Sequence, residues 1–233
     1  MSELPGRPWC ELPRPPSDAE RSALRRQLGR AVARAHQAPC EGFGYMFERK
    51  RLRGGTWADA FGAMMGALLD DAARFGTELP RPPDEIRGLV DAHRPALAEV
   101  ERPVLVHWDL WDGNILVSDD AAGMVVTGII DGERALQGDP VFEFPSLSVF
   151  REQAEDDRFV VDDDFLSGYC EVAGPLLLNG ALRARLALYR IYLYLVILIE
   201  VTPREISGEQ RHWRQTKGSA IVSRQLSLLE RPS

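Results

Sequence analysis

Val104-Leu-Val-His-Trp-Asp-Leu-Trp-Asp-Gly-Asn-Ile-Leu-Val117 is the stretch that decides the fold of this chain. It places His107, Asp109 and Asn114 in an H-x-D-x-x-x-x-N array between two short apolar runs. Apolar runs of this length predict β-strands, so the array is expected on the loop that joins them. Gly113 gives that loop a residue at which the backbone can turn sharply.

A second acid follows the next strand along the chain. The run from Met124 to Ile130 is β-like, and the polar segment 118–123 before it predicts a hairpin. Asp131 comes at the end of this run, where its carboxylate can face the same opening as the loop. A base, an amide and a second carboxylate are the groups that metal-assisted phosphoryl transfer needs, because oxygen atoms hold Mg²⁺. Plain turn formation by Asp, Asn and Gly is the alternative for the array alone.

The match to a known family extends beyond this array. The shared segments are Gly128-Ile-Ile-Asp-Gly-Glu133, Gly138-Asp-Pro140, Leu28-Gly29, Ala35-His36, Phe43-Gly44-Tyr45, Trp57 at the start of a helix, and the tail from Tyr189 to Glu200. Together these segments resemble the aminoglycoside phosphotransferase / choline kinase branch of the protein-kinase-like fold. The resemblance implies an α+β fold, predominantly α, namely the C-terminal catalytic lobe with a small β-hairpin catalytic sheet.

The resemblance also implies a role for each residue of the site. Asp109 matches the family's catalytic base, and Asn114 and Asp131 match the two ligands of the Mg²⁺ that accompanies ATP. His107 is expected to brace the loop, and Asp139 to fix the segment after the metal site. Two departures stand out: Trp108 occupies a position where the family often has Gly, and Gly132 follows the metal Asp where many relatives carry a larger residue.

Nothing before Asp109 resembles the nucleotide-binding lobe of a complete family member. Such a lobe has a Gly-rich loop and a strand lysine, whereas Lys50 and Lys217 are the only lysines and neither lies on a predicted strand. Residues 1–16 resemble the hinge between the lobes, and residues 17–233 are expected to form one catalytic lobe. Three explanations stay open: an internal Met as the recorded start, loss of the lobe, or a partner that supplies it.

Helical periodicity accounts for most of the remaining chain. A capping box at Ser17 and Glu20 begins a helix that should end near His36. A second helix begins near Thr56 and should bury the pair Met64-Met65. A short helix is expected around 86–90, and a series of helices from 163 to the end, broken near 174–175, at 180 and at 203. Three strands in total are expected.

Composition excludes several classes of protein. The chain of 233 residues is 45% apolar, and its net charge of −7 argues against nonspecific binding to nucleic acid or anionic membranes. The three cysteines, Cys10, Cys40 and Cys170, lie far apart, which favours buried thiols in a reducing cytoplasm. The longest apolar run, Ile191 to Ile199, is too short to span a bilayer and predicts a buried helix. We therefore expect a cytoplasmic protein.

Two hypotheses of function follow. The first is an ATP-dependent phosphotransferase of the aminoglycoside-kinase type that acts on a hydroxyl of a small molecule, with loops near 43–45, Trp57 and 150–170 around the acceptor. The acidic segment from Glu152 to Asp164 would attract a cationic acceptor, or would simply be a solvated loop. The second is a non-catalytic module, in which an apolar hinge-side surface drives homodimerisation or binds a partner.

Overall fold

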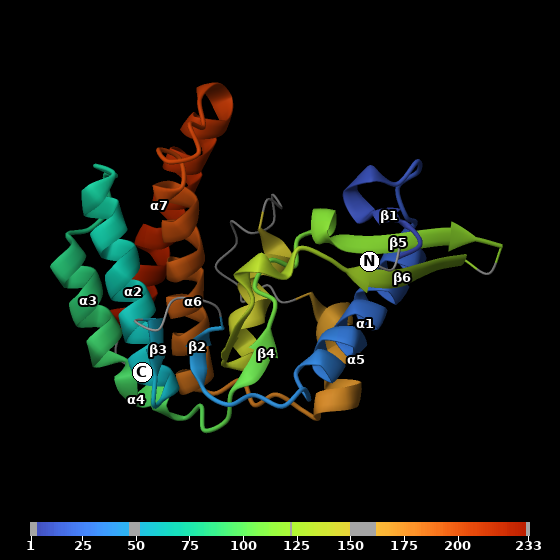
Figure 1. The fold of residues 1–233 in the computed structure, drawn as a ribbon, viewed down its shortest axis with the longest axis horizontal. Helices are drawn as coiled ribbons and strands as arrows, with labels where there is room; N and C mark the ends of the chain where they lie inside the picture. The colour runs from blue at the N-terminus through green and yellow to red at the C-terminus, as the bar shows by residue number, and fades with distance from the viewer. Residues whose placement is uncertain (1–3, 47–51, 122, 150–161, 232–233) are drawn as a thin grey trace. The chain divides into compact units, whose positions relative to one another are not determined.

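The computed structural model of the chain describes residues 4–46, 52–121, 123–149 and 162–231 (Figure 1). Contacts within the chain divide it into two compact units. Unit 1 comprises Met1–Glu41 and Val104–Leu177, and unit 2 comprises Gly42–Pro103 and Leu178–Ser233. Helices dominate both units and the strands are short, so the predicted α+β class, mainly α, is confirmed. The assignment of residues 17–233 to one catalytic lobe stays a prediction.

Unit 1 combines a three-stranded sheet with two helices. The sheet has the order β1-β5-β6, with β1 at Arg7–Pro8, β5 at Ile115–Asp120 and β6 at Gly123–Ile129. The helices α1 (Asp18–Ala35) and α5 (Asp163–Ala173) pack along one another, as Figure 1 shows. A separate antiparallel pair joins β4 (Val104–Val106) to β7 (Leu136–Gly138). The described residues of the unit also form the 3-10 segments η1 (Trp9–Glu11), η3 (Asp112–Asn114), η4 (Gly132–Arg134) and η5 (Pro140–Ser148).

Helix α1 forms where the capping box predicts it. The Ser17 hydroxyl accepts from the Glu20 N–H at 3.4 Å, while a Glu20 carboxylate oxygen accepts from the Ser17 N–H at 2.8 Å. The apolar face of the helix is buried, with Leu24, Leu28 and Val32 at 0–2% exposure. Local capping and helical periodicity together therefore position α1 against the sheet and α5.

The hairpin of unit 1 is longer than its apolar pattern indicates. The first strand was expected to end at Val117, but β5 continues to Asp120 because Ser118 pairs with Val125 and Asp119 with Met124. The register is irregular between Leu116 and Val117, which marks a bulge in the strand. Polar residues continue a strand when a partner strand accepts their backbone hydrogen bonds.

The expectation of three strands is wrong for the described residues. Residues 1–16 were not counted among the three expected strands, yet β1 pairs with β5, with Arg7 opposite Val117. The strands β2 (Phe43–Tyr45) and β3 (Arg53–Gly54) form an antiparallel pair in unit 2, and β7 pairs with β4 in unit 1. These strands have two or three residues each, so no alternation of apolar and polar residues signals them.

Unit 2 is built mainly of helices. They are α2 (Trp57–Arg74), α3 (Pro83–Ala92), α4 (Arg94–Ala98), α6 (Gly180–Ile199) and α7 (Gly208–Leu229). Thr56 caps α2 as predicted, and Met64 and Met65 are both buried at 1% exposure. The short helix α4 was not anticipated. Figure 1 shows α6 running beside α7, and no described helix combines the length and the hydropathy that a membrane span requires.

The core of unit 2 lies around α6. The run from Ile191 to Ile199 is buried, as predicted. Trp57, at 0% exposure, donates from Nε1 to the Tyr189 hydroxyl at 2.6 Å and packs against Phe61. Trp57 is thus a core residue, and the expectation that the loop near it surrounds the acceptor stays a prediction.

The cysteines are less buried than predicted. All three are free thiols, but Cys10 is exposed and Cys40 and Cys170 are partly exposed. In η1 the neighbouring Trp9 takes the buried position, which leaves Cys10 on the outer side of the turn. Burial nevertheless raises the pKa of the Cys10 and Cys40 thiols.

Candidate active site

The loop between β4 and β5 brings the array together in unit 1. After Val106 the chain leaves the strand, turns at Trp108 with a φ of 60°, and enters η3 at Asp112. The Asn114 N–H donates to the Trp111 carbonyl at 2.9 Å, which closes this turn. The Asn114 carbonyl accepts from the Ile130 N–H at 3.0 Å, so the loop is joined to the end of β6.

His107 links the loop to the strand that carries the second acid. Its Nε2 lies 2.9 Å from the Ile130 carbonyl oxygen, and its Nδ1 lies 3.3 Å from the Asp109 backbone nitrogen. A carbonyl only accepts and a backbone N–H only donates, so these two contacts require the neutral ring with the proton on Nε2. The geometry gives His107 the bracing role that the sequence predicted for it.

Glu143 also holds this loop, through hydrogen bonds to the loop backbone. Sequence reasoning did not identify this residue. This carboxylate is 1% exposed and accepts from the backbone N–H groups of His107 and Trp108, each at 2.7 Å. His36 lies close by, with Nε2 3.8 Å from Glu143 Oε2 and Nδ1 2.9 Å from the Tyr169 hydroxyl. A single acid inside the apolar run Val141–Phe144 was the available signal, because a buried carboxylate needs partners.

The structure explains how Trp108 can stand at a position where the family often has Gly. A φ of 60° favours Gly, and a bulky residue there is a true outlier. The indole is held in this conformation by stacking on Phe142, with ring centroids 5.5 Å apart and an angle of 20° between the planes. Packing and the hydrogen bond to Glu143 thus offset a backbone strain that typically amounts to about 1–3 kcal/mol.

Asp109, the predicted base, is partly buried beside a cation. Its side chain is 27% exposed, and Oδ2 lies 3.8 Å from Arg134 Nε. Burial raises the pKa of Asp109; the Arg134 guanidinium acts in the opposite direction, and the charge of Asp131 raises it further. The guanidinium of Arg134 also lies over the Trp108 ring, 5.7 Å from its centroid.

Asn114 and Asp131, the predicted metal ligands, come together with Asp109. The Asn114 amide is buried and donates from Nδ2 to the Asp109 carbonyl at 2.9 Å, which leaves its oxygen as the ligand atom. Asp131 comes two residues after the end of β6, as the N-cap of η4; it adopts the left-handed conformation, at φ 64° and ψ 55°, and is exposed. Asp tolerates this conformation better than most residues. Ile130, the residue before Asp131, is hydrogen-bonded to both His107 and Asn114, which holds Asp131 next to the loop.

The oxygen donors suit Mg²⁺ bound together with phosphates. Within the described ranges, no group of three or more His, Cys, Asp and Glu side chains is arranged around a metal position. Mg²⁺ is usually held by one or two carboxylates plus substrate phosphates and water, rather than by a cage made only of protein. The pair Asn114 and Asp131 therefore fits that mode of binding.

Asp139 has the structural role expected of it. It is 1% exposed, and its Oδ1 accepts from the Val141 N–H at 3.0 Å as the N-cap of η5. This cap fixes the start of the 3-10 segment that carries Glu143. The carboxylate thus supports the loop through Glu143.

The acidic segment proposed for acceptor binding lies largely outside the described residues, from 152 to 161. Two described members have structural partners. Asp162 accepts from the backbone N–H groups of Asp164 and Phe165 as the N-cap of α5, and Asp164 accepts from Ser22 and Arg26. The Ser22 hydroxyl and Arg26 lower the pKa of Asp164. These two acids therefore secure α5.

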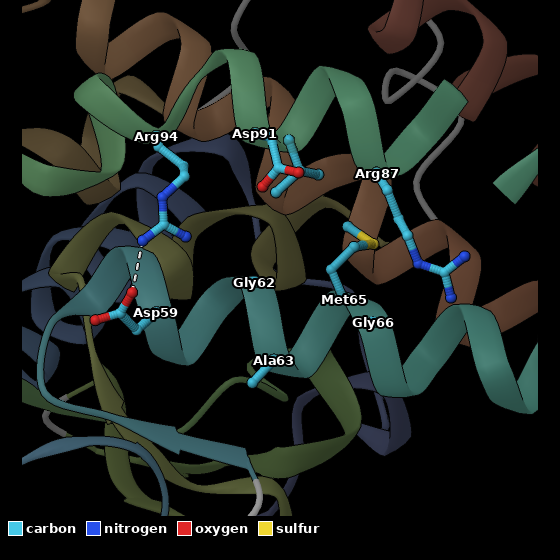
Figure 2. A pocket seen from close by; sticks show the side chains of 9 residues that line it. Asp59, Gly62, Ala63, Met65, Gly66, Arg87, Asp91 and Arg94 are labelled. Atoms are coloured by element: carbon cyan, nitrogen blue, oxygen red, sulfur yellow. Dashed lines mark hydrogen bonds and ion pairs between the residues drawn. The ribbon is translucent and has the colours of Figure 1, made fainter. Parts of the chain in front are cut away.

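A cavity of about 260 Å³ lies in unit 2 between α2 and the helices α3 and α4 (Figure 2). Gly66 forms part of its floor, and Asp59, Arg87, Asp91 and Arg94 stand around it. Arg94 donates to Asp59 at 2.5 Å, the dashed contact in Figure 2, and Arg87 pairs with acids outside the cavity. None of the predicted site residues lines this cavity.

A loop that carries a base and an amide, followed by a hairpin that ends in an acid, defines the catalytic part of a protein-kinase-like phosphotransferase. The chain belongs to the phosphotransferase enzyme family, whose family model matches residues 1–188. The resemblance seen in the sequence is therefore confirmed. No curated protein sequence matches the chain significantly.

Solved structures share the fold. A protein assigned as a fructosamine-3-kinase from Thermobifida fusca is 24% identical with a TM-score of 0.62, and the match covers 90% of this chain and 67% of that one. A protein assigned as an aminoglycoside phosphotransferase from Ralstonia eutropha is 15% identical, with a TM-score of 0.65 and coverages of 99% and 72%. A choline/ethanolamine kinase family protein from Mesorhizobium loti is 19% identical, with a TM-score of 0.55 and coverages of 91% and 68%.

Proposed function

We propose that this chain transfers the γ-phosphoryl group of ATP to a hydroxyl of a small molecule. The observation that carries the proposal is the convergence of Asp109, Asn114 and Asp131 on one braced loop and hairpin. Family membership supports phosphotransfer to a small molecule. LicA, a similar structure at 16% identity and a TM-score of 0.58, was solved in complex with AMP. A cytoplasmic location, where ATP is present, accompanies this proposal.

In this mechanism Asp109 is the base. Its carboxylate, whose pKa is raised by burial, orients the acceptor hydroxyl and takes its proton. Asn114 and Asp131 would hold Mg²⁺, which neutralises charge on the phosphates when it is bound. His107 and Glu143 touch the loop backbone, so they keep the base at a fixed distance from the ligand pair.

Calorimetric titration of ATP into the chain, with and without Mg²⁺, tests the proposal. We expect binding that requires Mg²⁺ and weakens at least about tenfold in Asp131→Ala and in Asn114→Ala, because each substitution removes a ligand atom. Asp84→Ala is the matched control, because that acid is 96% exposed and lies on α3 in unit 2. Binding without Mg²⁺, or equal binding by Asp131→Ala and Asp84→Ala, would contradict the assignment.

Turnover provides the second test. With an acceptor found by screening small alcohols and aminosugars for ATP consumption, Asp109→Ala should lower the rate about 10²–10⁴-fold, the usual contribution of a general base. Near-normal turnover by this variant would remove Asp109 from the mechanism. Absence of Mg²⁺-dependent ATP binding by the unmodified chain would favour the non-catalytic binding module instead.

A further inference from the structure

A partly buried ion pair joins helix α1 to the candidate catalytic loop. Arg25 is 2% exposed, and its Nη2 lies 2.5 Å from Asp112 Oδ1. Asp112 is the first residue of η3 and comes two residues before Asn114. The two partners are 87 residues apart in sequence, so the contact exists only in the folded chain.

The surroundings of Arg25 shield its guanidinium from water, whereas the Asp112 side chain is 32% exposed. The Trp9 ring lies over the guanidinium, 4.1 Å from Cζ to the ring centroid, and is itself 7% exposed. Asp162, the N-cap of α5, approaches on another side, with Oδ2 3.6 Å from Nε. Burial lowers the pKa of Arg25 and raises that of Asp112, so both charges are kept in an environment that disfavours them.

Such a pair is a poor device for stability alone. Desolvation of two charges largely offsets their attraction, and apolar residues of similar volume often stabilise a core equally well. What the pair supplies is a fixed direction for the Asp112 side chain, because a planar guanidinium binds a carboxylate in a defined geometry. In η3 that direction matters, since a turn of three residues cannot move Asp112 without moving Asn114.

We propose that Arg25, acting through Asp112, is a positioning residue that sets the place of Asn114 in the catalytic loop. The expected effect of Arg25 on nucleotide binding rests on the proposed function. Its expected effect on the position of the loop does not. Trp9 covers the pair from the N-terminal segment, so that segment also contributes to the site. Arg25 touches no reacting atom and contacts the loop through Asp112.

The test compares backbone amide exchange of residues 107–117 with Mg²⁺·ATP affinity across matched variants. Arg25→Met should speed exchange of the loop about tenfold or more, because local opening becomes easier. Arg26→Met is the control: Arg26 is the next residue on α1, but it pairs with Asp164 of α5 at an exposed position. Arg25→Lys keeps the charge but lacks the planar guanidinium, so loop exchange should stay faster than in the unmodified chain.

The double variant Arg25→Met/Asp112→Leu separates positioning from stability. It replaces the ion pair by apolar side chains, so the thermal midpoint should return toward that of the unmodified chain. Loop exchange should nevertheless stay fast and Mg²⁺·ATP affinity low, even if the single variant Arg25→Met fails to fold. Full recovery of loop protection in the double variant, or equal exchange in Arg25→Met and Arg26→Met, would overturn the proposal.

The two readouts also distinguish this proposal from the proposed function. If the unmodified chain does not bind Mg²⁺·ATP, the phosphotransferase assignment fails on that result alone. The exchange comparison between Arg25→Met, Arg26→Met and the double variant still decides whether Arg25 holds the loop.

Discussion

The Nε2 atom of His107 lies 2.9 Å from the carbonyl oxygen of Ile130, the residue directly before Asp131. The other ring nitrogen accepts from the Asp109 N–H. One imidazole therefore spans the two segments that carry the carboxylates of the site. A rigid ring thus links the segments of Asp109 and Asp131, the proposed base and metal ligand, although the two acids lie on different elements.

Replacement of this ring should loosen both segments. In His107→Leu the Ile130 carbonyl and the Asp109 N–H lose their partners, so the free energy of unfolding should fall by about 1–3 kcal/mol. Mg²⁺·ATP affinity should fall as well, because Asp131 follows Ile130. Chemical denaturation and calorimetry measure these effects. His212→Leu, at an exposed position of α7, should stay within about 0.5 kcal/mol; equal losses in both variants would argue against the bridge.

Glu143→Gln tests the anchor beneath the loop. In the unmodified chain two backbone N–H groups each donate to a Glu143 oxygen at 2.7 Å. The amide of the variant keeps the size of the side chain, but its NH2 group faces one of these two donors and cannot accept from it. Loss of one charged hydrogen bond predicts a destabilisation of about 1.5–3 kcal/mol in denaturant unfolding. Glu171→Gln removes an acid from an exposed ion pair with Arg30 and should change stability by no more than about 1 kcal/mol. A smaller effect at Glu143 than at Glu171 would contradict the anchoring role.

Local signals predicted most of the fold. The Ser17 capping box gives α1 its start, Thr56 gives α2 its start, and the apolar run from Ile191 places α6 in the core. These signals work because caps and periodicity depend on neighbours in sequence. The positions of Asp109, Asn114 and Asp131 could be inferred for the same reason, since the loop and the hairpin are adjacent in the chain.

Contacts across the chain escaped prediction. Glu143 reaches the N–H of His107 from 36 residues away, and Arg25 reaches Asp112 from 87 residues away. Neither contact leaves a periodic trace in the sequence. Trp108 could be flagged as unusual, but its positive φ depends on stacking with Phe142, which only the folded unit provides. The short strand β1 likewise exists only because β5 offers it a partner.

Asp109 should reduce stability while it serves activity. Burial raises its pKa above the ordinary value of 3.8, so the folded chain binds a proton more readily than the unfolded chain. The contribution of this carboxyl to the free energy of unfolding is therefore lowest at a pH above its folded pKa. That contribution rises as the pH falls through the folded pKa toward 3.8. Asp109→Asn should raise the thermal midpoint at pH 7; a gain of about 1 kcal/mol corresponds to about 2–4 °C.

The same substitution should remove the pH dependence that Asp109 contributes. The difference in midpoint between Asp109→Asn and the unmodified chain should shrink as the pH falls through the folded pKa, because the native carboxyl becomes neutral. With Asp109 as the proposed base, turnover of the unmodified chain should decline over the same pH window, since a protonated base accepts no proton. A lower midpoint for Asp109→Asn at pH 7 would show that the ion pair with Arg134 outweighs burial.

Gly29 and Gly66 should respond to the same substitution with opposite signs. Both lie inside helices, where Ala is favoured over Gly by about 0.5–1 kcal/mol. A Cβ on Gly29 of α1 would overlap the Phe165 carbonyl oxygen of α5, whereas a Cβ on Gly66 of α2 meets nothing within 4 Å. Gly66→Ala should therefore stabilise the chain by up to about 1 kcal/mol. Gly29→Ala should destabilise it by at least about 1–3 kcal/mol, because the two backbones must separate. Denaturant unfolding of both variants decides the matter, and a stabilising Gly29→Ala would show that α1 and α5 do not pack at this distance in solution.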